Sequence, residues 1–165
     1  VKTALGPSTL RVLDKGTNEV IERALRKIDL GALAACDDQD AFDDFLMACI
    51  VKVGNSIKRK NRDKGNGAVW GYGAKAVNLY FRSIVLESRY YPDAVEKRLK
   101  RLLHVPVDRI VLVRLRELGV ATAPRAIKDV DSKPKYKAIQ QVIATAAKTA
   151  GVPPIHFDDV WSKAD

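Results

Sequence analysis

The sequence predicts an all-α protein of six to seven helices packed as a compact orthogonal bundle. Apolar residues recur at intervals of three and four over most of the chain, and no segment alternates with the period of two that indicates a strand. Hydrophobic residues make up 47% of the 165 positions, enough for a packed interior and too many for a disordered chain. This length fits a single domain, or two small helical lobes in which 1–60 and 132–165 form one lobe and 61–131 the other.

The first half of the chain predicts three helices. One begins near Thr17, a suitable N-cap, and continues to about 34, and a second follows the acidic stretch 37–40 and ends near 59. The helical pattern then breaks at 60–73, where four glycines and two aromatic residues predict a loop or hairpin that reaches Lys75. A third helix is expected over about 74–88.

The second half predicts three further helices and a short terminal one. A fourth helix is expected over about 93–103, and a fifth begins at 107 or 108 and stops at Gly119, a typical C′ glycine. Residues 120–134 are expected to form a loop with at most one short turn. A sixth helix over about 134–150 should stop at Gly151, and a short helix over about 157–163 ends the pattern.

The charge of the chain favours a polyanionic partner. Its formal net charge is +9, and such a charge binds nucleic acid through counterion release. Five basic residues stand beside the glycine-rich stretch with Asp63 as the one acid between them, and they are the expected phosphate contacts: Lys58, Arg59, Lys60, Arg62 and Lys64. A second basic cluster at 97–101 is better explained as the solvated face of a helix.

Several classes of protein are not expected from the composition. Cys36 and Cys49 are the only cysteines and lack metal-ligand spacing, so we expect no metal site and no cofactor. Cys49 lies within an apolar helical pattern and should be a buried small hydrophobe. No run of 18 apolar residues and no leader-like start is present, so we expect no membrane span and a cytoplasmic protein, nucleoid-associated if it binds DNA.

Residues 69–78, VWGYGAKAVN, could bind phosphate. Gly71 and Gly73 would permit a tight turn with positive φ, and the helix that follows would direct its free N–H groups at that turn. Lys75 would then stand in the first helical turn, beside the phosphate site. The alternative is an ordinary glycine turn ahead of a core helix, with a solvated lysine.

Residues 105–118, VPVDRIVLVRLREL, place a carboxylate at the start of a helix. Pro106 fixes the backbone before this helix, and Asp108 falls in its first turn, where a carboxylate caps the helix and is stabilised by the helix dipole. A functional role for Asp108 would need a partner, such as an amine or a developing cation.

In combination, these two segments resemble the helix-hairpin-helix DNA glycosylase superfamily, whose hairpin follows an apolar-Pro-Gly-apolar-Gly-x-Lys pattern. Trp70 stands where proline is usual, and the matching positions are Gly71, Gly73, Lys75 and Asn78. The stretch 105–108 is similar to the superfamily's second hallmark, a Val-Pro-Val-Asp-like start of a later helix. The separation of Lys75 and Asp108 is similar to that in archaeal 8-oxoguanine DNA glycosylases. Parts of both segments also resemble uncharacterised bacterial helical proteins.

The resemblance implies a base-excision enzyme that acts on double-stranded DNA without a metal, and with lyase activity if a lysine Schiff base forms. It implies Lys75 as the nucleophile and Asp108 as the catalytic aspartate, which would accept the lysine's proton and stabilise positive charge on the sugar. Aromatic side chains commonly hold a flipped base, and the candidates are Trp70, Tyr72 and Trp161. Two alternatives remain: a non-catalytic nucleic-acid-binding module, and a structural or interaction protein in which Lys75 and Asp108 form an ordinary ion pair.

Overall fold

The computed structural model describes residues 13–57 and 70–162. Within these ranges the chain forms eight α-helices, one π-helical turn and one 3-10 turn, and no strand. The predicted all-α class is therefore confirmed. The α-helices are α2 (Thr17–Leu25), α3 (Leu30–Ala34), α4 (Gln39–Gly54), α5 (Trp70–Arg82), α6 (Asp93–Leu102), α7 (Arg109–Glu117), α8 (Lys133–Ala150) and α9 (His156–Ser162), and the two short turns are η3 (Ser83–Glu87) and η4 (Ile127–Asp129).

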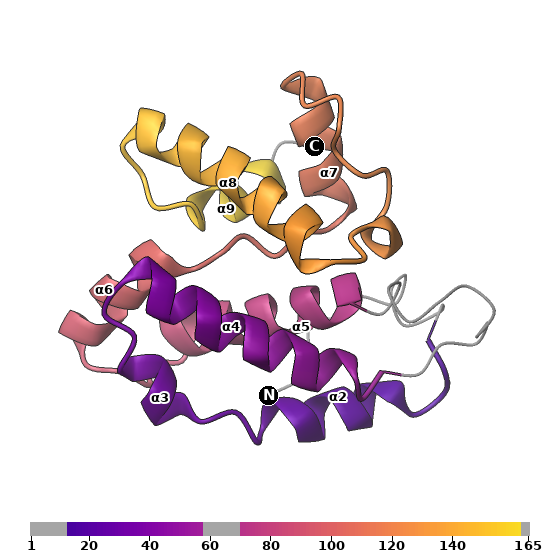
Figure 1. Ribbon diagram of the computed structural model, residues 1–165. Coiled ribbons are helices and arrows are strands. Elements are labelled where there is room, and N and C mark those ends of the chain that lie inside the picture. The colour runs from indigo at the N-terminus through magenta and orange to yellow at the C-terminus, as the bar shows by residue number, and fades with distance from the viewer. Residues whose placement is uncertain (1–12, 58–69, 163–165) are drawn as a thin grey trace.

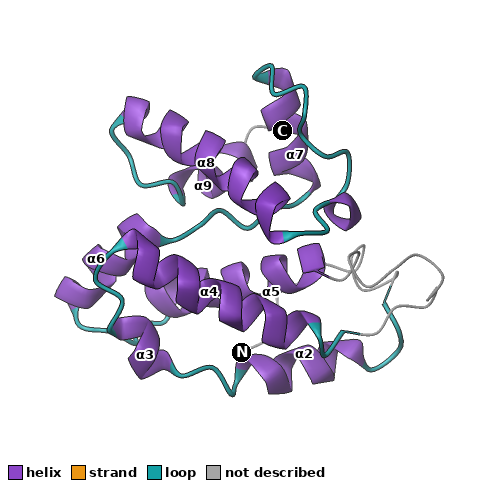
Figure 2. Cartoon of the chain, in the orientation of Figure 1, coloured by secondary structure: helices purple, strands orange, loops and turns teal. Residues whose placement is uncertain are grey.

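The helices lie in two layers (Figures 1 and 2). Helices α2 to α6 form one layer, α7 to α9 form the other, and the extended segment 103–108 joins them. This grouping differs from the expected lobes, in which residues 132–165, the part of the chain that forms α8 and α9, share a lobe with residues 1–60. Consecutive helices with short connections pack beside one another, so each layer takes up a continuous part of the described chain.

The expected first helix, 17–34, is wrong, because the chain forms two helices there. The backbone of Asp29 is extended, and its carboxylate accepts hydrogen bonds from the N–H groups of Gly31 at 2.8 Å and Ala32 at 3.1 Å. Asp29 is therefore the N-cap of α3, and an N-cap residue cannot continue the helix before it. The same chemistry begins α4, where Asp38 accepts from the N–H of Ala41 at 2.8 Å.

The predicted ends of two later helices are confirmed. Gly119 and Gly151 follow α7 and α8 with φ of +85° and +68°, values that glycine adopts without strain. The long second helix ends at Gly54 rather than near 59, and the loop after α7 contains the single short turn η4.

Both layers contribute to the buried interior. Phe42 and Phe81 of the first layer and Leu112 and Ile143 of the second are fully buried. Cys49 is also buried, as predicted, and burial raises the pKa of its thiol to about 11. None of the helices in the described ranges is long and apolar enough to cross a membrane.

Candidate active site between the two layers

Lys75 and Asp108 meet where the two layers face each other. The Nζ atom of Lys75, on α5, lies 3.7 Å from Oδ2 of Asp108, the residue that precedes α7. The side chains are 15% and 31% exposed, so the pair is shielded but not sealed from solvent. The two residues that the sequence motifs single out are therefore adjacent in space, although 33 positions separate them.

The carboxylate of Asp108 is held by the helix that it caps. Its Oδ1 accepts the N–H groups of Ile110 at 2.9 Å and Val111 at 3.1 Å, which fixes the orientation of the whole group. Val105 and Val107 are buried before it and fasten the extended segment between the layers. One oxygen of Asp108 thus positions the carboxylate, and the other faces the amine of Lys75.

The expected glycine hairpin is wrong for residues 70–75, because α5 already begins at Trp70. Neither Gly71 nor Gly73 has a positive φ. A Cβ at Gly71 would collide with the carbonyl oxygen of Ile127 and lie 2.8 Å from that of Val130, and a Cβ at Gly73 would lie 3.0 Å from the backbone of Gly54.

These two glycines are needed for close packing rather than for a turn. The missing Cβ of Gly71 leaves room for the backbone around η4 to pack against α5, and that of Gly73 leaves room for the end of α4. Lys75 accordingly stands in the second turn of α5 and not in the first. The expected phosphate-binding roles of Gly71 and Gly73 depended on a glycine turn. Both glycines lie within α5 and neither lies in a turn, so the structure removes the basis for these roles.

The aromatic candidates for base stacking are packed against the protein itself. Tyr72 is only 5% exposed and Trp161 only 8%, so neither lies in an open loop. Trp161 packs on Phe157, with ring centroids 4.8 Å apart. Trp70 is half-buried and meets the ring of Tyr136 edge-on at 5.2 Å. The expectation that Trp70 and Tyr72 lie in a loop is therefore wrong.

The structure adds residues to this site that sequence reasoning missed. Arg82, two turns after Lys75 on α5, binds two consecutive acids of α9: its Nε lies 3.1 Å from Asp158 Oδ2, and its Nη2 donates to Asp159 Oδ1 at 2.8 Å. The Nε–H does not point at Asp158, and this buried nitrogen has no hydrogen-bond partner among the described residues. A spacing of seven residues puts Arg82 on the helix face of Lys75, which the sequence could have indicated; nothing in it indicated the acids of α9.

The surroundings of Asp158 favour the neutral form of its carboxyl. Burial raises the pKa of its carboxyl, and the negative charges of Asp108 and Asp159 act in the same direction, while the positive charges of Arg82 and Lys75 oppose them. The same interactions show that Asp158 lies within electrostatic range of both Lys75 and Asp108. The candidate site therefore contains two carboxylates, those of Asp108 and Asp158, and two cations, those of Lys75 and Arg82.

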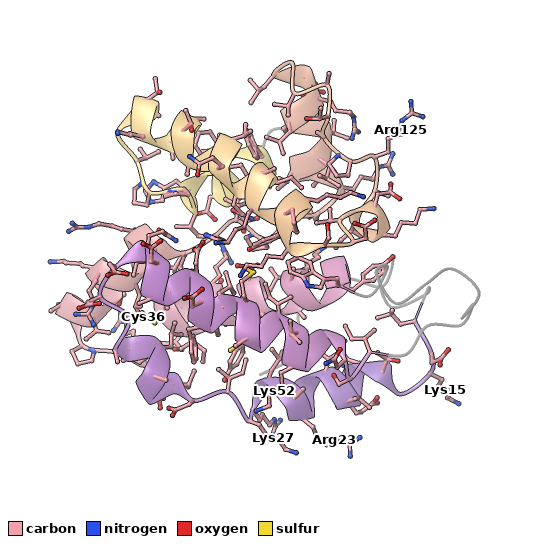
Figure 3. All side chains as sticks on the ribbon, in the orientation of Figure 1. Lys15, Arg23, Lys27, Cys36, Lys52 and Arg125 are labelled. Carbon is pink, nitrogen blue, oxygen red and sulfur yellow. The ribbon has the colours of Figure 1, made fainter. Side chains whose placement is uncertain are left out.

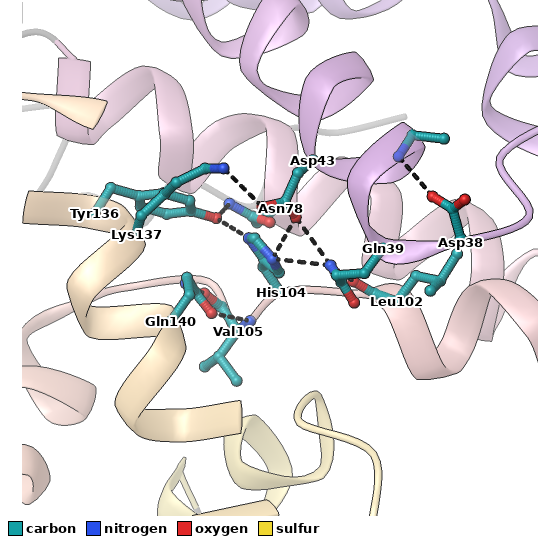
Figure 4. A network of polar contacts seen from close by, with 11 residues as sticks. Asp38, Gln39, Asp43, Asn78, Leu102, His104, Val105, Tyr136, Lys137 and Gln140 are labelled. Atoms are coloured by element: carbon teal, nitrogen blue, oxygen red, sulfur yellow. Dashed lines mark hydrogen bonds and ion pairs between the residues drawn. The ribbon is translucent and has the colours of Figure 1, made fainter. Parts of the chain in front are cut away.

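A second polar network lies elsewhere between the layers (Figure 4). Asp43 of α4 lies 3.1 Å from Nε2 of His104, whose Nδ1 lies 3.0 Å from the hydroxyl of the fully buried Tyr136. Asn78 donates to the same hydroxyl at 2.8 Å, and Lys137 of α8 reaches Asp43 at 3.2 Å. This network links α4, α5 and α8 and borders a cavity of about 290 Å³.

The network keeps Asp43 ionised. Burial by itself would raise the pKa of this carboxyl, but hydrogen bonds from His104 and Gln39, together with Lys137, hold the pKa well below its usual range. Burial likewise raises the pKa of the Tyr136 hydroxyl well above its usual value. The role of His104 as a link between the two layers was not predicted from the sequence.

The main basic cluster, from Lys58 to Lys64, lies outside the described residues. In the second cluster, Arg98 donates to the carbonyl oxygens of Ala34 and Cys36 and so caps α3, which is a structural role. Figure 3 shows Arg23 and Lys27 pointing outward from one layer and Arg125 from the other. Exposed cations are thus present on both layers.

No protein-family model, no curated protein and no solved structure matches this chain.

Proposed function

We propose that the protein is a base-excision glycosylase acting on double-stranded DNA, with lyase activity through a Schiff base on Lys75. The supporting observation is the approach of Lys75 Nζ to Asp108 Oδ2, at 3.7 Å, on a face that remains partly open to solvent. The net charge of +9 supports a DNA partner, and with it a place on the nucleoid in the cytoplasm.

The chemistry needs a neutral amine beside a fixed negative charge. The Lys75 ammonium first gives up a proton to a carboxylate. The free amine attacks C1′ of the target nucleotide, the new C1′–N bond forms as the bond to the base breaks, and the base leaves with the electron pair and takes a proton. Asp108 stays ionised and stabilises the positive charge that develops on the sugar. The attached nitrogen then loses a proton, its electron pair forms the C1′=N bond as the C1′–O4′ bond breaks, and O4′ takes up a proton. Strand cleavage follows from the resulting protonated imine.

The experiment is sodium borohydride trapping on a panel of duplexes, each carrying one lesion: 8-oxoguanine, uracil, an alkylated purine or an abasic site. Borohydride reduces the imine to a stable amine and leaves protein and DNA covalently joined. We expect the wild type to be trapped on at least one duplex, Lys75→Gln to abolish trapping while binding remains, and Asp108→Asn to slow base release by orders of magnitude. Lys137→Gln is the matched control, because it removes a lysine that also pairs with an aspartate between the layers.

The other outcomes separate the competing functions. Firm binding of DNA without excision from any duplex would make the protein a non-catalytic nucleic-acid-binding module. Absence of both binding and excision would leave Lys75 and Asp108 as an ordinary ion pair within a structural or interaction protein.

A further inference from the structure

Asp158 is the acid of this site that the sequence motifs do not include. It stands on α9, which packs against α7, the helix that Asp108 caps. Arg82 holds it from α5 at 3.1 Å, on the same helix face as Lys75. Asp158 therefore approaches the Lys75–Asp108 pair from the third helix around it.

Two carboxylates that feel the charge of the same amine can take different roles if their environments differ. Asp108 already accepts hydrogen bonds from two backbone N–H groups at the start of α7, and such hydrogen bonds stabilise the ionised form of a carboxylate. Asp158 is more deeply buried, and the Nε–H of Arg82 does not point at it. Asp158 is thus the better group to carry a proton, and Asp108 the better group to remain charged.

We propose that Asp158 is the proton shuttle of this site: it takes a proton from Lys75 Nζ through intervening water, because the two groups are not in ion-pair contact, and returns it to the departing base. This proposal rests on the proposed glycosylase activity. In the balanced step, the ammonium loses a proton and Asp158 becomes neutral; the amine forms the bond to C1′ as the bond to the base breaks. The base leaves with that electron pair and receives the proton from Asp158, which is ionised again.

The charges around Asp158 fit a group that cycles between two protonation states. Arg82 and Lys75 favour its charged form, whereas Asp108, Asp159 and burial favour its neutral form, and together they raise its pKa. A carboxyl with a raised pKa transfers protons near neutral pH more effectively than an ordinary surface acid. Arg82 also pairs with Glu87, so its charge is shared among three acids.

The neighbouring Asp159 provides a matched control. It binds the same arginine at 2.8 Å but is 47% exposed. Asp158→Asn and Asp159→Asn therefore each remove one partner of Arg82 and one negative charge from α9. Removal of the charge alone would make Lys75 easier to deprotonate, so a purely electrostatic role for Asp158 predicts an equal or faster reaction in Asp158→Asn.

The test is single-turnover base release, measured from pH 4 to 9 on the duplex that traps the wild type best. We expect Asp158→Asn to slow release about 10²- to 10⁴-fold, Asp159→Asn to remain within a few-fold of wild type, and Asp158→Glu to recover part of the rate. We also expect the wild-type rate to be level near neutral pH and to fall at acid pH as Asp158 becomes protonated. In Asp158→Asn the level region should be lost and the rate should rise with pH across the whole range, because Lys75 can then lose its proton only to solvent. The wild-type profile is a test in itself if the variant does not fold.

Each remaining result overturns the proposal in a distinguishable way. If the wild type is trapped but Asp158→Asn releases the base as fast as Asp159→Asn, Asp158 is not the shuttle and the glycosylase proposal stands. A wild-type rate that does not fall at acid pH would likewise exclude Asp158 as the shuttle and leave the glycosylase proposal standing. If the wild type is trapped on no duplex, the proposed function fails and the shuttle fails with it.

Discussion

Replacement of Gly71 by alanine tests the packing that places Lys75. The added Cβ would meet two backbone carbonyls, that of Val130 at 2.8 Å and that of Ile127 closer still, and backbone atoms cannot rotate away as a side chain can. Overpacking of this kind costs about 1–3 kcal/mol, whereas alanine gains up to about 1 kcal/mol over glycine within a helix. Because both contacts are with backbone, we place the cost near the top of its range and expect a net loss of about 2 kcal/mol.

Gly54 provides the control for this change. It also lies in a helix, but a Cβ there would meet nothing within 4 Å, so Gly54→Ala should be neutral or stabilising by less than about 1 kcal/mol. In thermal unfolding followed by circular dichroism, a loss of about 2 kcal/mol corresponds to a midpoint lowered by roughly 4–8 °C for a chain of this size. Gly73→Ala, with its contacts at 3.0 Å, should fall between the two.

A midpoint for Gly71→Ala equal to or above that of Gly54→Ala would refute this reasoning. It would mean that the first turn of α5 does not lie against residues 127–130. The position of Lys75 opposite Asp108 would then lose its structural basis, since the same helix carries both Gly71 and Lys75.

Three further predictions concern the polar network and the charge. Asp43→Asn should lower the free energy of unfolding, measured in urea at pH 7, by about 3 kcal/mol. Because the folded protein lowers the pKa of Asp43, the contribution of this carboxylate to stability is present above pH 4 and is lost as the pH falls. The stabilities of the wild type and the variant should therefore converge in acid. Tyr136→Phe should cost about 1–3 kcal/mol by leaving the Asn78 amide without its hydroxyl partner, and an unchanged midpoint would contradict the hydrogen bond. Serine at all basic positions of 58–62 should reduce the salt dependence of DNA binding by about one unit of slope per lost phosphate contact, and an unchanged slope would exclude this cluster from the interface.

The parts of the fold that depend on local chemistry could be predicted from the sequence. Gly119 and Gly151 end helices because only a residue without a Cβ adopts their φ easily. The break between α2 and α3 was missed although its cause is local: the cap at Asp29 lies within a helical apolar pattern that continues on both sides of it.

The glycines of α5 could not be assigned from the sequence. A glycine that provides a positive φ and one that provides space for a neighbouring backbone are the same letter, and only the packing of α4 and η4 against α5 distinguishes them. The early start of α5 moved Trp70 and Tyr72 from an expected loop into a helix.

The candidate site could be predicted in part. The order of two short motifs correctly associated Lys75 with Asp108, which lie in ion-pair contact. Asp158 was missed, because consecutive acids at a helix start ordinarily serve the helix dipole, and only the fold brings them to Arg82. Contacts between distant segments depend on how helices cross, and this chain contains no local signal for that crossing.

The most direct test of the central claim is to identify the residue that becomes attached to DNA. Wild-type protein would be trapped with borohydride on the duplex of the panel that gives the strongest product, digested, and its peptides analysed by mass spectrometry. The glycosylase proposal predicts the nucleotide adduct on the peptide that contains Lys75, and its loss in Lys75→Gln. An adduct on the N-terminal amine or on a lysine of 58–64, or no adduct on any duplex, would contradict it.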